Sequence, residues 1–312
     1  MKCKLNSEKE LIELSIVTTI YKSEKYISEF YRRTLKVAQK YFNSIEIIFV
    51  NDGSPDRSSA IVRSLCRDDY RIKLIELSRN FGHHKAIMTG LSYAKGDLIW
   101  LIDSDLEEEP EWLIDFYEKF RNNDVDLVFG VQKKRRGNIF DRIAGKIYFS
   151  FINSISSIKL QEKGITTSSL MTANYKNALC EYKEQNVVLS GLFALTGFRQ
   201  IPCEVNKKNN SPSTYNFIIK TRLIFDTITS LSAFPLVITF YLGISIFFFS
   251  VIYTMYVIYG WLTQSSPVPG WTSVMVSIWM IGGILIAILG LIGIYISRIF
   301  IETKRRPYTT IR

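Results

Sequence analysis

Two long apolar segments without a single charged residue constrain this chain more than any other feature of its sequence. They cover residues 233–259 and 274–296. Each exceeds the roughly 20 residues that an α-helix needs to cross the hydrocarbon core of a membrane. Two buried core helices are the alternative, but a core helix seldom needs apolar residues on every face over such a length. The sequence therefore predicts two membrane-spanning helices, which we bound at 233–259 and 274–297.

The charges that flank these segments predict their orientation. The connector 260–273 contains no Lys or Arg, whereas Lys220 and Arg222 precede the first segment and a basic tail, 298–312, follows the second. Positively charged flanks are retained on the cytoplasmic side of a membrane. We therefore expect an integral membrane protein with two spans, an external loop at 260–273 and both termini in the cytoplasm.

The formal net charge of +10 also raises nucleic acid as a partner. However, the basic residues gather beside the apolar segments and in the run 133–136, and no aromatic-basic RNA motif or zinc-finger spacing accompanies them. Anionic lipid is the simpler partner for such a distribution. The expected partners therefore include a membrane and exclude nucleic acid.

The cysteines and the N-terminus indicate a reducing compartment for the part before residue 233. The N-terminal residues have no apolar core of signal-peptide length, so we do not expect this part to be exported. The four cysteines show no C-x-x-C spacing. We interpret them as free thiols rather than as a metal site or a disulfide framework.

Short β-branched apolar runs alternate with helical patterns in the N-terminal two thirds of the chain. The predicted strands are 13–19, 45–50, 71–77, 97–102 and 126–131, and helical periodicity occurs at 25–42 and 110–121. Such alternation predicts an α/β domain with a mainly parallel sheet covered by helices. We bound this catalytic domain at 1–210, followed by an amphipathic juxtamembrane helix at 211–232.

Polar residues follow four of the predicted strands, at 21–24, 51–54, 79–80 and 103–105. In open parallel sheets, ligands collect beyond the carboxyl ends of the strands. Asp103 and Asp105 would project to one face if the strand continued through them. Two such carboxylates can hold Mg²⁺ or Mn²⁺ while a diphosphate fills further positions. A lone D-x-D is more often a solvated turn, but this one follows a buried strand.

Asp52 lies in the turn V-N-D-G-S-P-D. Gly53 can supply a positive φ there, and the following residues are typical of a helix start. The whole turn can be purely structural. Asp52 is nevertheless the member best placed to accept a hydrogen bond from a nucleobase.

Several strings occur in a family-specific order: IYKSEKYI, VNDGSPD, SRNFGHHKAIMTGLSYAKGD and LIDSDLEEEPEWL, followed by two C-terminal spans. This series resembles family-two glycosyltransferases with the GT-A fold. More narrowly, it is similar to the polyprenyl-phosphate branch, which includes dolichol-phosphate mannose synthase and the bactoprenol glucosyltransferases. The similarity covers nearly the whole chain.

The resemblance implies a metal-dependent, inverting transfer of a sugar from a nucleotide-linked, UDP-type donor to a polyprenyl phosphate at the cytoplasmic membrane face, as in cell-envelope polysaccharide synthesis. It implies catalytic and metal roles for Asp103 and Asp105, with Mg²⁺ or Mn²⁺ as cofactor. Where relatives commonly carry Gln, this chain has Glu107, which we expect as a third metal ligand. The predicted nucleotide-binding set is Thr19, Tyr21, Glu24, Asp52, Arg79 and Ser104. Whether the chain forms a homo-oligomer stays open.

Glu107 has a second interpretation that weighs equally. Together with Glu108, Glu109 and Glu111 it can be favourable charge in the first turn of a helix. His83 and His84 follow a glycine turn into a predicted helix, and because no partner carboxylate is visible in the sequence we favour packing or capping for both.

Two segments depart from the family pattern, and the departures concern the sugar, the acceptor contacts or both. Thr167 and Ser169 stand where relatives carry Asp and Arg, and Lys208 replaces an Arg in a later loop. A phosphate monoester is largely a dianion at neutral pH, so it needs no side-chain base to act as a nucleophile. We expect Arg135, Arg136 and Lys208 to bind the acceptor phosphate, although 133–136 can equally be a solvated loop.

Two alternatives follow from these departures. One is a catalytically altered membrane scaffold that binds nucleotide sugar, and the other is a glycosyltransferase with a different lipid acceptor. Intact Asp52, Asp103 and Asp105 argue against the scaffold. A processive polysaccharide synthase is disfavoured, because the sequence has only two predicted spans and no Q-x-x-R-W string.

Overall fold

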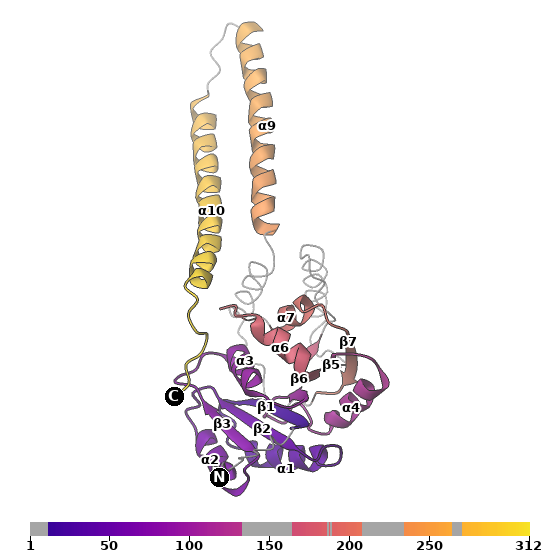
Figure 1. Ribbon diagram of the computed structural model, residues 1–312. Helices are drawn as coiled ribbons and strands as arrows, with labels where there is room; N and C mark the ends of the chain where they lie inside the picture. Colours follow the sequence, from indigo (N-terminus) through magenta and orange to yellow (C-terminus); the bar gives the residue numbers. More distant parts are fainter. Residues whose placement is uncertain (1–11, 133–163, 186, 188, 208–233, 264–269) are drawn as a thin grey trace, which may run out of the picture. The chain divides into compact units, whose positions relative to one another are not determined.

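The computed structural model describes residues 12–132, 164–185, 187, 189–207, 234–263 and 270–312. These residues fall into two compact units. The first holds the described residues up to 207 together with Pro307–Arg312, and the second holds those from 234 to 306. The first is an α/β unit, and the second consists of long helices (Figure 1).

A seven-stranded sheet forms the centre of the α/β unit, in the order β3-β2-β1-β4-β6-β5-β7. Its strands are β1 (Leu14–Ile20), β2 (Ile45–Asn51), β3 (Ile72–Glu76), β4 (Leu98–Leu101), β5 (Leu127–Gln132), β6 (Ile165–Thr172) and β7 (Gln200–Val205). β3, β2, β1 and β4 are mutually parallel, and β5 is parallel to β7. Only β6 is antiparallel to its neighbours, β4 and β5. The expected mainly parallel sheet is therefore confirmed.

The five strands expected from the sequence are all present, each within two residues of its predicted bounds. β6 and β7 were not predicted. The segment that forms β6 reads ITTSSLMT, and its hydroxyl side chains hide the apolar alternation that marks a strand. Because Ser168 and Ser169 are fully buried, this strand is part of the core despite its polar composition.

Helices cover both faces of the sheet. They are α1 (Ile27–Ala38), α2 (Ser58–Asp68), α3 (His83–Tyr93), α4 (Trp112–Asn122), α6 (Ala173–Glu181) and α7 (Leu189–Leu195). One apolar cluster joins the sheet to α1, α2 and α4, and the other joins it to α3, α6 and α7. Neighbouring residues of a strand pack into different clusters: Ile16 belongs to the first and Val17 to the second. The side-chain alternation of a β-strand explains this division.

The second unit contains two long helices, α9 (Phe234–Thr263) and α10 (Trp271–Thr303). Both extend beyond the spans expected from the sequence. Among the described residues, one helical segment, Ile281–Thr303, is long and apolar enough to cross a membrane, and a shorter apolar segment covers Leu236–Ile246. The predicted juxtamembrane helix at 211–232 lies outside the described residues.

Candidate active site

The predicted polar segments gather at one edge of the sheet. β1 ends at Ile20, β2 at Asn51, β3 at Glu76 and β4 at Leu101, and the four strands are parallel neighbours. Their carboxyl ends therefore lie side by side at one end of the strands. The loops that follow carry Tyr21, Asp52, Arg79 and Asp103, in agreement with the sequence expectation.

Asp103 and Asp105 lie in the loop after β4, not in the strand itself. The expectation that they project like alternate strand residues is wrong, because β4 ends at Leu101 and the chain turns at Leu106, whose φ is 59°. The carboxylate of Asp105 closes this turn by accepting the Glu107 N–H at 2.9 Å. Burial is the first cause of the raised pKa of Asp105. A partly buried acid of this kind favours a nearby cation.

The loop after β4 carries Asp103, Asp105, Glu107 and Glu108 and is called the acidic loop here. Glu108 attaches this loop to β6. Its side chain is fully buried and accepts hydrogen bonds from the Asp103 N–H at 3.4 Å and from the Thr167 N–H at 2.9 Å. Burial raises its pKa to about 8. Because α4 begins at Trp112, Glu107 and Glu108 precede the helix, and the interpretation of them as charges in its first turn is wrong.

Lys207 is a site residue that sequence reasoning missed. Its ammonium lies 3.4 Å from Glu107 and 3.9 Å from Glu108, although it follows β7, at the opposite edge of the sheet from β3. Burial lowers the Lys207 pKa, but the negative charges of Glu108 and Asp103 outweigh this, and the net direction is upward. In the sequence Lys207 and Lys208 are adjacent, and the resemblance points to Lys208 as the functional lysine.

His83 also reaches the acidic loop. Its Nε2 lies 3.4 Å from Asp103 Oδ1, and its Nδ1 lies 3.0 Å from the Thr19 hydroxyl. The expectation that His83 has no partner carboxylate is therefore wrong, because the partner comes from a different strand end. Ser104 donates to the Thr19 carbonyl at 2.8 Å, so that two predicted nucleotide-site residues are in direct contact.

The Nδ1 of His84, by contrast, lies within hydrogen-bonding distance of the Val187 carbonyl, at 3.0 Å. Its burial lowers its pKa. This contact agrees with the packing role that we expected for it.

Asp52 organises the loop between β3 and α3. It is almost fully buried, and its two oxygens accept the N–H groups of Phe81 at 2.7 Å and Gly82 at 3.0 Å. A carboxylate has further lone pairs, so these bonds leave room for a nucleobase donor. Gly82 takes a φ of 100°, which a side chain would disfavour, and α3 begins directly after it.

The loop residues 79–80 lie directly on the turn that carries Asp52. A Cβ atom added at Gly53, whose φ is +62°, would stand 2.6 Å from both Arg79 C and Asn80 N. Arg79 itself is exposed, with its guanidinium carbon 4.2 Å from the centre of the Phe81 ring. Glycine at position 53 is therefore required by contact as well as by backbone conformation.

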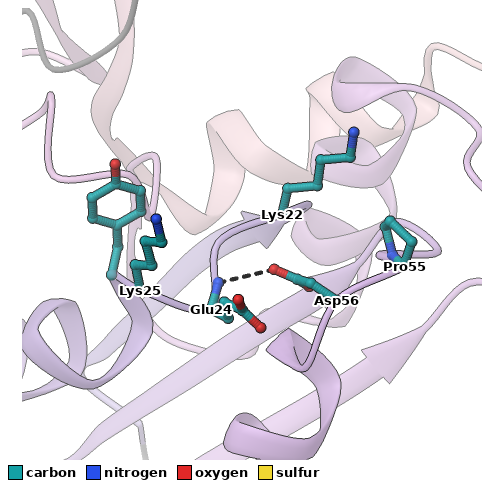
Figure 2. Close-up of a pocket in the computed structure, with 6 residues that line it drawn as sticks. Lys22, Glu24, Lys25, Pro55 and Asp56 are labelled. Carbon is teal, nitrogen blue, oxygen red and sulfur yellow. Dashed lines mark hydrogen bonds between the residues drawn. The ribbon is translucent and has the colours of Figure 1, made fainter.

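Tyr21 and Glu24 belong to a second group on the same edge. Glu24 donates its N–H to Asp56 at 3.1 Å and accepts the Arg57 N–H at 3.1 Å. A cavity of about 410 Å³ opens here, lined by Lys22, Glu24, Lys25, Tyr26, Pro55 and Asp56. Figure 2 shows the Lys22 and Lys25 side chains on either side of the Glu24–Asp56 hydrogen bond. Tyr21 is 45% exposed and thus open to a ligand.

The donor set of the acidic loop fits a hard divalent cation. Asp103, Asp105 and Glu107 are partly buried and bring three carboxylates near one ammonium, Lys207, which leaves an excess of negative charge. Within the described residues, however, no three His, Cys, Asp or Glu side chains are already arranged around a common point. Such a cation would therefore need ligands from the donor diphosphate as well.

The predicted acceptor-phosphate residues Arg135, Arg136 and Lys208 lie outside the described residues. Ser169 and Thr167 are described and belong to β6. Ser169 is fully buried opposite Leu101 of β4, and the backbone of Thr167 serves Glu108. Thr167 and Ser169, which depart from the family pattern, thus belong to the strand to which Glu108 of the acidic loop is hydrogen-bonded.

Residues 15–180 match the family described as glycosyl transferase family 2. Over 301 residues the chain is 46% identical to a Mycobacterium tuberculosis protein provisionally named as a glycosyltransferase, covering 96% of this chain and 88% of that one. It is 29% identical over 299 residues to the bactoprenol glucosyl transferase of Shigella phage SfV, covering 95% of this chain and 97% of the phage protein.

A crystal structure described as that of a mycobacterial protein superposes with a TM-score of 0.50 at 16% identity, covering 70% of this chain and 75% of that one. At such low identity the similarity concerns the fold alone. Together with the sequence match over residues 15–180, it describes the α/β unit as a GT-A-like fold with a mostly parallel sheet.

Proposed function

The chain belongs to glycosyl transferase family 2, and from that premise we propose that it transfers a sugar from a nucleotide-sugar donor to a polyprenyl phosphate at the cytoplasmic face of a membrane. The observation that carries the proposal is the acidic loop after β4, where Asp103, Asp105 and Glu107 face Lys207. Members of families with this fold commonly use divalent metals. A bound metal would supply positive charge to the departing diphosphate.

In this proposal, different residues bind the diphosphate and the nucleoside of the sugar donor. Asp103, Asp105 and Glu107 hold Mg²⁺ or Mn²⁺, and Lys207 supplies a further positive charge beside the diphosphate. Asp52, Tyr21 and Glu24 bind the nucleoside at the ends of β2 and β1. His83 positions Asp103, because its ring bridges that carboxylate and Thr19.

The chemistry needs no side-chain base. A phosphate monoester carries close to two negative charges at pH 7, so its oxygen is already a nucleophile. That oxygen forms a bond to the anomeric carbon, and the bond from the anomeric carbon to the nucleotide diphosphate breaks, with the electron pair leaving on the diphosphate. A single displacement of this kind inverts the anomeric configuration. The protein contributes positioning and charge stabilisation.

The lipid nature of the acceptor is supported by the helical unit and by the relatives. Large apolar side chains on α9 and α10 are exposed, among them Phe249 at 74% and Ile286 at 73%. An apolar surface of this extent indicates contact with a membrane or another protein. The phage relative is named for bactoprenol, a polyprenyl lipid. We propose two spans at 233–259 and 274–297, with Arg135, Arg136 and Lys208 binding the acceptor phosphate.

The deciding experiment is transfer of radiolabelled sugar to polyprenyl phosphate by the full chain in detergent. A panel of UDP- and GDP-linked sugars is supplied with and without Mg²⁺ or Mn²⁺. We expect a labelled lipid with one donor, and only in the presence of metal. Nucleotide-sugar binding without transfer to any lipid phosphate would instead favour the altered scaffold, and transfer to another lipid would change the acceptor.

A further inference from the structure

The last six residues of the chain return to the α/β unit and lie along its open edge. β3 is the outer strand of the sheet, paired on one side with β2. On its other side the tail pairs with the end of β3 in the antiparallel direction, with Leu77 opposite Ile311. The Arg312 N–H donates to the Glu76 carbonyl at 2.8 Å, and the Ser78 N–H donates to the Thr310 carbonyl at 2.9 Å.

Side chains of the tail strengthen this attachment. The Thr309 hydroxyl lies 2.7 Å from the Thr89 hydroxyl of α3. Tyr308 packs against the apolar cluster that joins the sheet to α3, α6 and α7, and burial raises its pKa. In Figure 1 the C-terminus lies beside β3 and α3. The tail therefore contacts both elements that border the loop 78–82.

That loop is the one that binds Asp52. Ser78, bonded to the tail, leads directly into Phe81 and Gly82, whose N–H groups meet the Asp52 carboxylate. On the inner side, Gly53 packs against the Arg79–Asn80 peptide. The loop is thus held from the β2 turn on one side and from the tail on the other. α3 follows immediately and carries His83, the partner of Asp103.

We propose that Pro307–Arg312 is a positioning element of the donor site: a clasp that holds the 78–82 loop and the start of α3, so that nucleotide affinity depends on the docked tail. This inference rests on the proposed function in that it takes Asp52 as a donor-binding residue. The same tail covers the end of the outer strand β3 through one isolated bridge, and an open edge would invite pairing with other chains.

The test uses the full chain with an N-terminal affinity tag and three variants. One ends at Arg306 and lacks the whole clasp. The second, Arg312→Pro, removes the charged side chain together with the N–H that bonds to the Glu76 carbonyl. Its matched control, Arg312→Ala, removes the same charged side chain but keeps the N–H. Proline is compatible here because its preceding residue, Ile311, takes part in an extended pairing.

We expect UDP or GDP, whichever binds the unmodified chain by calorimetry, to bind the truncated chain about tenfold more weakly, within the usual range of coupling between two sites. Arg312→Pro should weaken binding by about threefold, in line with part of one net hydrogen bond, and Arg312→Ala should not. In transfer assays the donor KM should rise with the acceptor KM unchanged, whereas a loss of folded protein would lower only the rate. Hydrogen exchange of the Phe81 and Gly82 amides should be fastest in the truncated chain, slower in Arg312→Pro, and unchanged in Arg312→Ala.

Two results would overturn the clasp on different grounds. If the truncated chain binds nucleotide and protects the Phe81 and Gly82 amides like the unmodified chain, the tail has no positioning role. If the unmodified chain binds neither UDP nor GDP, the proposed function fails, and the donor role of the tail fails with it. Should the truncated chain not fold, the comparison of Arg312→Pro with Arg312→Ala decides the matter.

Discussion

Asp105 is a partly buried carboxylate whose immediate surroundings contain three more acids and one lysine. We expect Asp105→Ala to abolish metal-dependent transfer while the protein stays folded, because the departing diphosphate then loses part of its charge compensation. Removal of an electrostatic stabiliser of this kind typically costs about 100-fold or more in rate. The measurement is sugar transfer to lipid phosphate in saturating Mg²⁺ or Mn²⁺.

Asp115→Ala is a suitable control, because Asp115 is an exposed acid on α4. It should transfer sugar like the unmodified chain. If Asp105→Ala keeps more than about a tenth of the activity, a metal role for Asp105 is hard to maintain.

Gly53 provides a second residue-scale prediction, and Gly197 is its control. Both take positive φ values, 62° and 70°, so alanine strains the backbone at either position. Only at Gly53 would the new Cβ stand 2.6 Å from the Arg79–Asn80 peptide, since Gly197 has no neighbouring atom within 4 Å. We expect Gly53→Ala to displace the loop and raise the donor KM by about tenfold, whereas Gly197→Ala should affect stability alone. Equal donor KM values in the two variants would contradict this account.

At the scale of elements, β6 and β7 complete a site that the first four strands begin. Thr167 of β6 fixes Glu108, and Lys207, which follows β7, lies beside Glu107. The adjacent lysines allow a matched comparison. Lys207→Gln should raise the donor KM by about tenfold, because a charge-assisted contact to the diphosphate is lost. Lys208→Gln should raise the acceptor KM and leave nucleotide binding nearly unchanged.

The measurement for this pair is a donor titration and a lipid-phosphate titration of each variant, with nucleotide binding followed by calorimetry. Replacing the basic residues 133–136 together should behave like Lys208→Gln. If Lys208→Gln and the 133–136 variant transfer sugar normally, those cations are merely solvated and the acceptor site lies elsewhere.

The junction of α1 and α2 carries a pH-dependent contribution to stability. Asp69, at the end of α2, accepts hydrogen bonds from Arg71 at 2.8 Å and from the Tyr31 hydroxyl at 2.7 Å. The Arg71 hydrogen bond is the main cause that lowers the Asp69 pKa to about 2. Because the folded-state pKa lies below that of the unfolded chain, the stabilisation is present above about pH 4 and is lost as the pH falls toward 2.

We therefore expect Asp69→Asn to unfold more easily than the unmodified chain at pH 7, by roughly 1 to 2 kcal/mol. The difference should shrink between about pH 4 and pH 2, where the native carboxylate is protonated too. Thermal unfolding in detergent at a series of pH values measures it. A constant difference across that range would show that Asp69 acts through packing and not through its charge.

For the whole molecule, the charge bias around the two apolar segments predicts the topology. Residues up to about 228 and the tail after Arg298 should lie on the same, cytoplasmic side, with the connector outside. A reporter inserted at Gln264 should be accessible from outside, whereas reporters at the two termini should not. Termini on opposite sides would remove one span and this topology with it.

The tail matters at this scale because it follows α10 in the chain yet belongs to the α/β unit. The chain therefore returns to the α/β unit at Pro307. An interpretation of 298–312 as no more than a basic tail leaves out this return. α10 itself extends to Thr303, so that Arg298 lies within the helix.

Much of the architecture was determined by local sequence alone. β1 to β5 appear in the sequence as short apolar runs, and the polar residues follow the carboxyl ends of the first four. Membership of glycosyl transferase family 2 follows from an ordered series of short motifs. Each strand signal lies within a short run of consecutive residues, where periodicity of burial is visible in the chain itself.

The tertiary structure alone decided which groups meet. His83 and Asp103 come from the ends of different strands, Glu108 joins the acidic loop to Thr167, and Lys207 approaches from β7. These contacts depend on the strand order, with β4 beside β1 and β6, which local periodicity does not encode. The pairing of Ile311 with Leu77 is the extreme case, because its hydrogen bonds use only backbone groups, and every residue except proline carries the same donor and acceptor.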